Sequence, residues 1–140
     1  MIVLDTNIVS EPLRARPHAG VMAWIDANQP IGLYVTSITL SESLAGMAIM
    51  QDGGKKDRKA AGFASLLQSL FYQRVLAFDE AAARAYAKIF AAMRASGRAI
   101  SLFDCQIAAI AMVHGFAVAT RDVQPFIDAG LDVINPWTDE

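Results

Sequence analysis

The sequence has few of the residues on which many site chemistries depend: one cysteine, two histidines and no apolar run long enough to span a membrane. A lone Cys105 cannot form an internal disulfide, and without cysteine partners it excludes a zinc–thiolate site. The longest apolar stretch, residues 105–120, is interrupted by His114 and Gly115 and falls short of the ~20 residues of a membrane span. Asp5 interrupts the N-terminal apolar run before it reaches the length of a secretory signal. We therefore expect a cytoplasmic protein with no membrane partner.

Excess positive charge and phosphate-binding glycine motifs are also missing. The 12 Lys and Arg against 14 Asp and Glu give a net charge of −2, so the composition lacks the basic footprint of a nucleic-acid-binding domain. No G-x-x-x-x-G-K-[ST] or G-x-G-x-x-G segment occurs, which argues against nucleoside triphosphatases and dinucleotide enzymes.

The two histidines and the cysteine do not suggest a catalytic pair. His18 lies in an early predicted helix and His114 at a helix end, where capping of the last carbonyls is expected, so a two-histidine nuclease is disfavoured. Cys105 and His114 are nine residues apart on one predicted helix, too far for a nucleophile and its base. We therefore expect Cys105 in the core.

Strand-like and helix-like segments alternate along the chain. Because strands that alternate with helices need crossover connections, the pattern predicts a parallel sheet. The hydrophobic content of 54% is ample for one core, and no linker divides the chain. We expect residues 1–140 to form a single α/β domain with three layers, α/β/α, around a mostly parallel sheet of four to five strands. The predicted strands are 2–4, 33–37, 75–78, 116–120 and 132–135, and the predicted helices are 18–29, 39–50, 55–72, 79–97 and 101–115.

Four acidic residues follow predicted strands or begin predicted helices. Asp5 ends the first strand, and Asp122 lies two residues past the strand at 116–120. Glu42 and Asp104 lie in the first turns of two helices. Ligands of open α/β sheets bind outside the carboxyl ends of the strands, so these four acids are predicted to converge on one rim.

Helix capping offers a structural alternative for each of these acids. Thr39 with Glu42, and Ser101 with Asp104, both fit the capping box, and the other two acids fit ordinary N-caps. Asp79 also follows a strand and begins a helix, and local pattern alone does not separate it from the four.

The set of four acids points to a metal site. Carboxylates at one rim repel each other by roughly 4 kcal/mol per close pair at an effective dielectric near 20, so a cation is expected among them. Oxygen-only ligands select Mg²⁺ or Mn²⁺, which keep several waters and leave positions for substrate phosphates. The implied chemistry is metal-assisted attack of water on a phosphodiester.

Four motifs in order resemble the PIN-domain ribonucleases, specifically the VapC-type toxins of toxin–antitoxin modules. The motifs are "LDTN", "SITLSESLAG", "FDCQIAAIA" and "ATRD", and they span essentially the whole chain. The opening "MIVLDTNIVSEPLR" and the closing "INPW" are most similar to the FitB subgroup.

This resemblance implies a PIN fold and an Mg²⁺- or Mn²⁺-dependent endoribonuclease that acts as a type II toxin. By family position, Asp79 is not catalytic and is expected to serve as a cap. Three further residues are implied to support the site: Thr6, Asn7 and Thr120. The residues implied to be catalytic and to bind the metal are Asp5, Glu42, Asp104 and Asp122.

The resemblance also implies partners. These are an RNA substrate, a second copy of the chain in a homodimer, and a cognate VapB-like or FitA-like antitoxin that forms a higher assembly and binds DNA on the toxin's behalf. An antitoxin arginine would match the carboxylate cluster. Local bases could contact RNA, although a solvated surface role is the simpler interpretation of them. These bases are Arg14, Arg16, Lys55, Lys56 and Arg98.

Other functions remain as alternatives. A catalytically idle PIN-fold binding module in an antitoxin–DNA repressor complex would not need the intact quartet. A receiver-type phosphoacceptor would have paired early acids and a late lysine, and a haloacid-dehalogenase-type phosphatase would have D-x-D where this chain has Asp5, Thr6 and Asn7.

Overall fold

Five short parallel strands form the central sheet, in the order β3-β2-β1-β4-β5. The structure is a computed structural model, and it describes residues 1–138. The all-parallel sheet with helices on both faces confirms the predicted α/β class. Its five strands match the upper end of the predicted four to five. The strands are β1 (Ile2–Leu4), β2 (Leu33–Thr36), β3 (Val75–Leu76), β4 (Ala117–Ala119) and β5 (Val133–Ile134).

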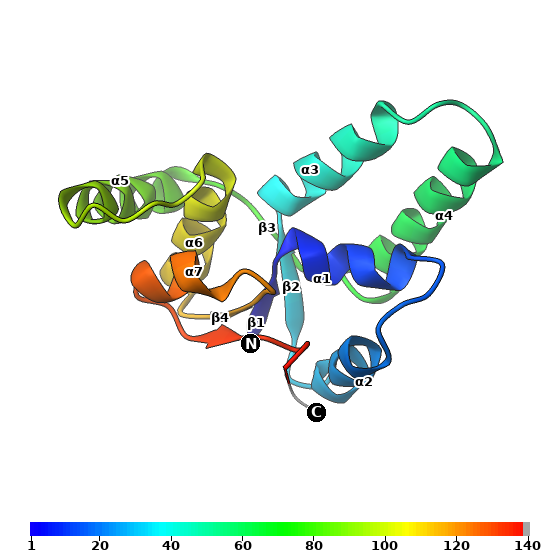
Figure 1. Ribbon diagram of the computed structural model, residues 1–140, viewed down its shortest axis with the longest axis horizontal. Helices are drawn as coiled ribbons and strands as arrows, with labels where there is room; N and C mark the ends of the chain where they lie inside the picture. Colours follow the sequence, from blue (N-terminus) through cyan, green and yellow to red (C-terminus); the bar gives the residue numbers. More distant parts are fainter. Residues whose placement is uncertain (139–140) are drawn as a thin grey trace.

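Helices cover the two faces of the sheet in separate groups (Figure 1). One face is covered by α1 (Thr6–Ser10), the 3-10 turn η1 (Glu11–Leu13), α2 (Ala19–Asn28) and α4 (Gly54–Ser69). The other face is covered by α5 (Glu80–Ala95), α6 (Leu102–His114) and α7 (Val123–Asp128). The remaining helix, α3 (Ser37–Ala48), follows β2 directly and contacts α1, α4 and α6. Among residues 1–138, no helix is long and apolar enough to cross a membrane.

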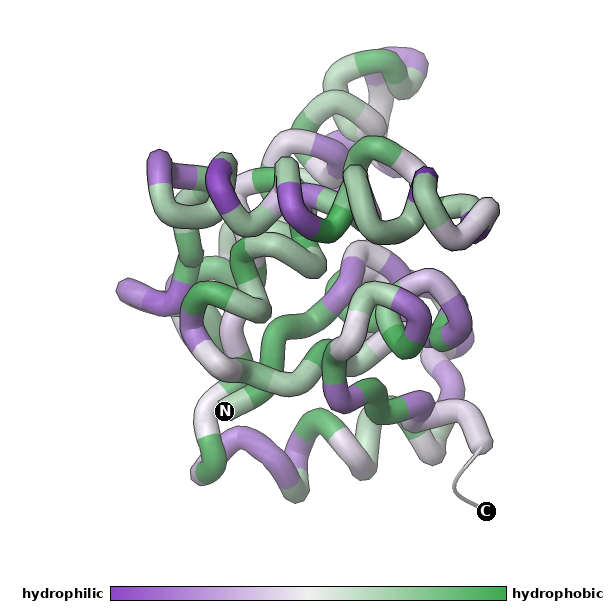
Figure 2. The backbone as a smooth tube through the Cα atoms, turned by 90° about the vertical axis from the view of Figure 1, so that its left-hand side faces the viewer, coloured by the Kyte–Doolittle hydropathy of each residue, from purple (hydrophilic) through white to green (hydrophobic). Residues whose placement is uncertain are grey.

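The alternation of side chains along β1 divides the core into two parts. Ile2 and Leu4 pack with the first group of helices, whereas Val3 packs with the second. Because both faces are buried, β1 is continuously hydrophobic. Figure 2 shows hydrophobic segments running through the centre of the molecule and hydrophilic segments along its outer turns.

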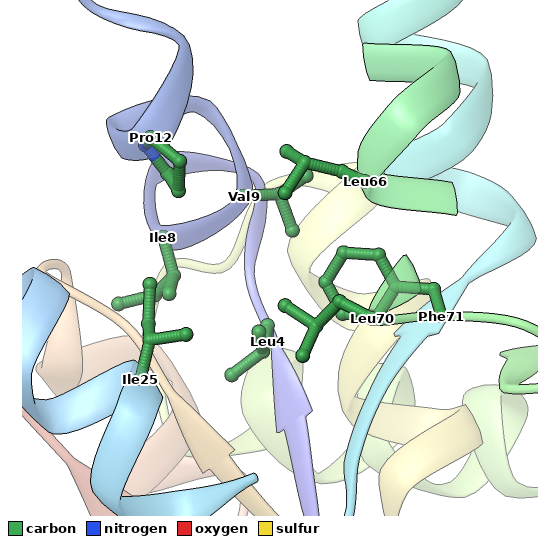
Figure 3. Close-up of a pocket in the computed structure, with 8 residues that line it drawn as sticks. All are labelled: Leu4, Ile8, Val9, Pro12, Ile25, Leu66, Leu70 and Phe71. Atoms are coloured by element: carbon green, nitrogen blue, oxygen red, sulfur yellow. The ribbon is translucent and has the colours of Figure 1, made fainter. Parts of the chain in front are cut away.

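Apolar packing fixes α1 against β1 and thereby positions the end of the strand. In Figure 3, Leu4 and Ile8 point toward side chains from α2, η1 and α4, around a gap too narrow to hold a water molecule. Phe71, just after α4, is fully buried here. The residues around this gap are Leu4, Ile8, Val9, Pro12, Ile25, Leu66, Leu70 and Phe71.

The N-terminus of α3 differs from the prediction. The helix begins at Ser37, because the Thr36 Oγ1 accepts a hydrogen bond of 3.1 Å from the backbone N–H of Thr39. The capping box of Thr39 with Glu42 is therefore wrong, and Glu42 lies in the second turn instead of the first. Its carboxylate is consequently not needed at the helix end.

At two other helix ends the predicted caps are observed, whereas the predicted capping by His114 is not. The Asp79 Oδ1 accepts from the backbone N–H of Ala82 at 2.9 Å, as expected for a cap. Gly115 ends α6 in the left-handed conformation at φ 70°. His114 makes no capping hydrogen bond within the described chain, and its ring packs against Phe116 with centroids 5.4 Å apart.

Three helical segments were not predicted, and four strands are shorter than expected, among them 33–37, which ends at Thr36, and 132–135, which is reduced to Val133–Ile134. The prediction left α1, η1 and α7 without assignment, and each has six residues or fewer. The strand at 75–78 ends at Leu76, since the backbone N–H of Phe78 donates to the Ser37 Oγ instead of to a strand. The strand at 116–120 is reduced to Ala117–Ala119.

Candidate active site

An open cleft lies at the carboxyl ends of the central strands, where β1 and β4 lead into α1 and α7. Its volume is about 340 Å³, and polar side chains from four segments of the chain line it. All four predicted acids are among these side chains. The lining residues are Asp5, Thr6, Asn7, Ser10, Glu42, Asp104 and Asp122.

Asp5 is held at the centre of this arrangement by two hydrogen bonds. Its Oδ1 accepts from the backbone N–H of Thr6 at 2.7 Å, and its Oδ2 accepts from the Thr120 hydroxyl at 2.8 Å. The backbone N–H of Asp5 donates to the Ala119 carbonyl, which extends the β1–β4 pairing to the cleft. Asp5 is 6% exposed, so it is both the N-cap of α1 and a nearly buried carboxylate facing the cleft.

Thr120 connects three residues of the site although it is fully buried. Its hydroxyl donates to Asp5 and accepts from the backbone N–H of Asp122 at 3.1 Å and from the Asn7 Nδ2 at 3.4 Å. This one hydroxyl therefore fixes the end of β1 relative to the end of β4. The sequence predicted Thr120 and Asn7 as supporting residues, and the structure places both in direct contact with the acids or with each other.

Glu42 is oriented by the third predicted supporting residue. The Thr6 hydroxyl donates to the Glu42 Oε1 at 2.9 Å and lies 3.4 Å from the Thr39 Oγ1. Because Thr6 directly follows Asp5, this contact links the acid of α3 to the acid at the end of β1.

Asp104 and Asp122 reach the cleft from α6 and α7. The backbone N–H of Asp104 donates to the Ser101 Oγ at 3.1 Å, which caps α6 as predicted and leaves the carboxylate beside the cleft. Asp122 occupies the N-cap position of α7, but its side chain makes no capping hydrogen bond to the described residues. The structural alternative for Asp122, an ordinary N-cap, is therefore not supported, and its carboxylate lines the cleft.

Burial and mutual repulsion make two of the carboxyl groups reluctant to ionise. Burial raises the pKa of Asp5, and the Glu42 and Asp122 carboxylates raise it further, while the hydrogen bonds from Thr120 and Thr6 oppose the shift. Burial also raises the pKa of Asp104, followed by the charge of Asp5 and, more weakly, that of Asp122, against the Ser101 hydrogen bond. The acids are thus close enough to interact electrostatically.

The donor set fits a hard divalent cation. Every polar group that lines the cleft offers oxygen or an amide, and no basic side chain within residues 1–138 forms an ion pair with any of the four acids. In the described chain, no three His, Cys, Asp or Glu side chains are placed so that they could together hold a metal ion. Mg²⁺ and Mn²⁺ do not need such a group, because they bind through one or two carboxylates and retain water.

Local sequence pattern did not distinguish Ser10, which the structure brings to the site, from its neighbours, nor Asp79, which the structure leaves outside the site, from the four acids. Ser10, at the end of α1, lines the cleft and donates to the Asn7 carbonyl at 3.3 Å, but a serine five residues after an aspartate carries no distinguishing signal. Asp79 does not line the cleft, which separates it from the quartet.

Comparison with known proteins places the chain in a family. The model of the PIN domain matches residues 2–130. Plasmid stability protein StbB of Pseudomonas syringae pv. tomato is 48% identical over 98% of this chain and 99% of its own length. VapC ribonuclease Y4jK of Sinorhizobium fredii is 45% identical over 98% of each chain.

A solved structure agrees with the sequence relatives. A chain in the crystal structure of FitAcB from Neisseria gonorrhoeae has a TM-score of 0.88 and 40% identity, over 99% of both chains. A chain in the structure of FitAB bound to the IR36 DNA fragment has a TM-score of 0.93, also at 40% identity, over 100% of this chain and 98% of that one. Since both fold and sequence match from end to end, this chain belongs to the PIN-domain family, in the group of VapC-type and FitB toxins.

Proposed function

We propose that this protein is the toxin of a type II toxin–antitoxin module and acts as an Mg²⁺- or Mn²⁺-dependent endoribonuclease. The observation that carries the proposal is the gathering of four carboxylates, from β1, α3, α6 and the start of α7, in one open cleft with no basic partner among the described residues. The relative named VapC ribonuclease supports RNA as the substrate.

The four acids would hold the cation and leave room for the substrate. Asp5, Glu42, Asp104 and Asp122 line a cleft of about 340 Å³, which exceeds what a hydrated cation alone requires. When bound, Mg²⁺ or Mn²⁺ supplies Lewis-acid polarisation of a phosphoryl oxygen and lowers the pKa of a bound water. The open cleft admits a single-stranded phosphodiester to this position.

The hydrogen-bonded residues would fix the acids in place. Thr120 holds Asp5 through its hydroxyl, and Thr6 holds Glu42, so neither carboxylate is free to rotate away. Asn7 bridges β1 and β4 through its contact with Thr120. These three residues would therefore contribute to metal affinity by orienting the acids.

The raised pKa values give the cleft a pH dependence. Because burial raises the pKa of Asp5 and Asp104, the protein without a cation favours their neutral forms more than free side chains do. A cation binds only the ionised carboxylates, so binding must release protons where these groups are protonated. Metal affinity should increase as the pH rises through the raised pKa values.

The test is cleavage of single-stranded RNA by the purified protein. We expect cleavage with Mg²⁺ or Mn²⁺, its loss on chelation, and its loss in Asp104→Asn with the fold retained by circular dichroism. Asp79→Asn, which alters an acid outside the cleft, should keep full activity. If Asp104→Asn is fully active, or if the wild type cleaves no RNA with either metal, the catalytic proposal is wrong and the idle binding module takes its place.

The partners follow from the same family. We propose a cognate antitoxin that covers the acidic cleft with a cation, binds promoter DNA and joins a toxin homodimer in a higher assembly. The structure of FitAB bound to a DNA fragment supports this arrangement. Large apolar side chains stay exposed on α5 and α6, as homodimerisation requires: Phe90, Leu102 and Phe103. Growth arrest on expression in the cytoplasm, relieved by co-expression of the neighbouring reading frame, would separate a toxin from a passive module.

A further inference from the structure

Arg121 lies at the edge of the acidic cleft, between two residues that face it or support it. Its backbone N–H donates to the Asn7 Oδ1 at 3.3 Å, and Asn7 lines the cleft. The preceding residue, Thr120, holds Asp5, and the following residue, Asp122, lines the cleft. The position of the Arg121 backbone is therefore fixed by the site itself.

The side chain of Arg121 is positioned by an aromatic ring. Its guanidinium carbon lies 5.2 Å from the ring centroid of Trp137, within the range of a cation–π contact. Trp137 follows β5, packs against the core and donates its backbone N–H to the Asn135 Oδ1 at 3.1 Å. Arg121 is exposed, so its guanidinium is held by stacking while its N–H groups stay accessible to a ligand.

Three of the five bases that the sequence suggested for RNA contact are already engaged in ion pairs. Arg14, Lys56 and Arg98, which the sequence suggested for RNA contact, each pair with a carboxylate. Arg121 makes no ion pair and no side-chain hydrogen bond within residues 1–138. It combines a guanidinium with no carboxylate partner in the described chain, a stacking contact that holds it, and a backbone position directly between Thr120 and Asp122 of the site.

Arg74 is the natural comparison for Arg121. It also stacks on an aromatic ring, with its guanidinium carbon 5.6 Å from the centroid of Tyr34. It precedes β3, however, and therefore lies at the amino ends of the strands, opposite the cleft. The two arginines share the same kind of contact and differ in the end of the parallel sheet at which they lie.

We propose that Arg121 is a substrate-positioning residue that binds a phosphate of single-stranded RNA adjacent to the phosphodiester in the acidic cleft. This rests on the proposed ribonuclease function and extends it to a named RNA contact. The four carboxylates repel the RNA backbone, so a cation at the edge of the cleft is needed to hold the neighbouring phosphate. A planar guanidinium stacked on Trp137 suits this role, because it presents paired N–H donors to phosphate oxygens without first being ordered.

The first test measures RNA binding without cleavage. A short fluorescein-labelled single-stranded RNA is titrated in an Asp104→Asn background, which removes cleavage, with and without Arg121→Gln. One phosphate contact to single-stranded nucleic acid contributes about 0.7 to the slope of log K against log salt, so Arg121→Gln should weaken binding about eightfold at 50 mM salt and about threefold at 200 mM. Arg121→Lys should retain the salt slope because it retains the positive charge. If Arg121 had only a structural role, the slope would not depend on whether the charge is kept.

The matched control is Arg74→Gln in the same background. It removes the same charge and the same kind of stacking contact, and it should leave the affinity and the salt slope unchanged. If Arg121→Gln leaves the slope at the parental value, or if Arg74→Gln lowers it equally, the proposal is overturned.

The second test uses the cleavage-competent protein. Arg121→Gln should raise KM for RNA several-fold with little change in kcat, because Arg121 holds a phosphate outside the reacting position. A loss confined to kcat would overturn this role. If the wild type cleaves no RNA, the ribonuclease proposal fails, whereas the binding titration still decides whether Arg121 contacts RNA.

Discussion

Replacing Thr120 with valine removes one hydroxyl from the buried contact between the ends of β1 and β4. Valine has nearly the same shape, so the substitution tests the hydrogen bonds and not the packing. The change removes the donor to the Asp5 carboxylate at 2.8 Å and the acceptor for the backbone N–H of Asp122 at 3.1 Å. Both partners lie at the cleft, and Asp5 is almost completely buried.

The expected loss of stability is worked from these two contacts, which are shorter than the third, from the Asn7 Nδ2 at 3.4 Å. A hydrogen bond to a charged group contributes about 1.5–3 kcal/mol and a neutral one about 1 kcal/mol, so Thr120→Val should lower the free energy of unfolding by about 2–4 kcal/mol. Thr120→Ser keeps the hydroxyl and loses one methyl group, which costs about 1 kcal/mol. The serine variant is therefore the matched control.

The loss of stability caused by Thr120→Val should depend on pH, and its direction can be predicted. The Thr120 hydrogen bond lowers the pKa of Asp5, so its removal raises that pKa further above the ordinary value of 3.8. A group with a raised folded-state pKa contributes stability below its unfolded pKa and loses it as the pH rises through the folded value. Thr120→Val should therefore be most destabilising near neutral pH and less so below pH 3.8.

Urea unfolding of the metal-free protein at several pH values measures this cost, with the denaturant slope checked for constancy. RNA cleavage by the same variant should fall about 10- to 100-fold, because a residue that orients a metal ligand has effects of that size. The role assigned to the Thr120 hydroxyl would be refuted if Thr120→Val lowered the free energy of unfolding by less than Thr120→Ser does. It would also be refuted if the decrease were larger in acid than at neutral pH.

Three further substitutions test other contacts. Asp104→Asn should raise the melting temperature of the metal-free protein at pH 7, since burial and neighbouring charge raise the pKa of Asp104, and the gain should disappear by scanning fluorimetry as the pH falls toward 3.8. Thr6→Val should release Glu42, destabilise the fold by about 1 kcal/mol and lower RNA cleavage about 10- to 100-fold in a gel assay. Phe71→Ala should cost about 3–5 kcal/mol in urea unfolding, because the ring is fully buried beside an existing gap.

Much of the fold could be predicted because long apolar periodicity and strand-helix alternation are encoded locally. The strand at 2–4 was predicted to the residue, and so was the glycine that ends α6, since Gly115 adopts the φ it permits. The short helices were not predicted, because one or two turns give too little periodicity to detect. The Pro125 within α7 further obscures that helix.

The cap of α3 shows the limit of local rules. Both Thr36 and Thr39 are acceptable N-caps, and only the position where β2 ends selects Thr36. Tertiary structure also determines the role of Asp122. This residue occupies the N-cap position of α7, but its side chain makes no capping hydrogen bond to the described residues. By contrast, Asp79 makes the cap that the sequence pattern suggested.

The candidate site was predictable where residue type and strand position coincided. The four acids and their three supporting residues lie at strand ends or early in helices, and the structure brings the acids into one cleft. The contacts between them were not predictable, because Thr6 meets Glu42 only across 36 positions of the chain. Arg121 was missed for the same reason: its significance depends on Trp137, which approaches it only in the folded sheet.

The most direct test of the account is calorimetric titration of the purified protein with Mn²⁺. We predict binding with proton release by the wild type, its loss in Asp5→Asn, and its retention in Asp79→Asn, which changes an acid that only caps a helix. Equal Mn²⁺ binding by the Asp5 and Asp79 variants, or no binding by the wild type, would contradict the claim that the clustered carboxylates form one metal site.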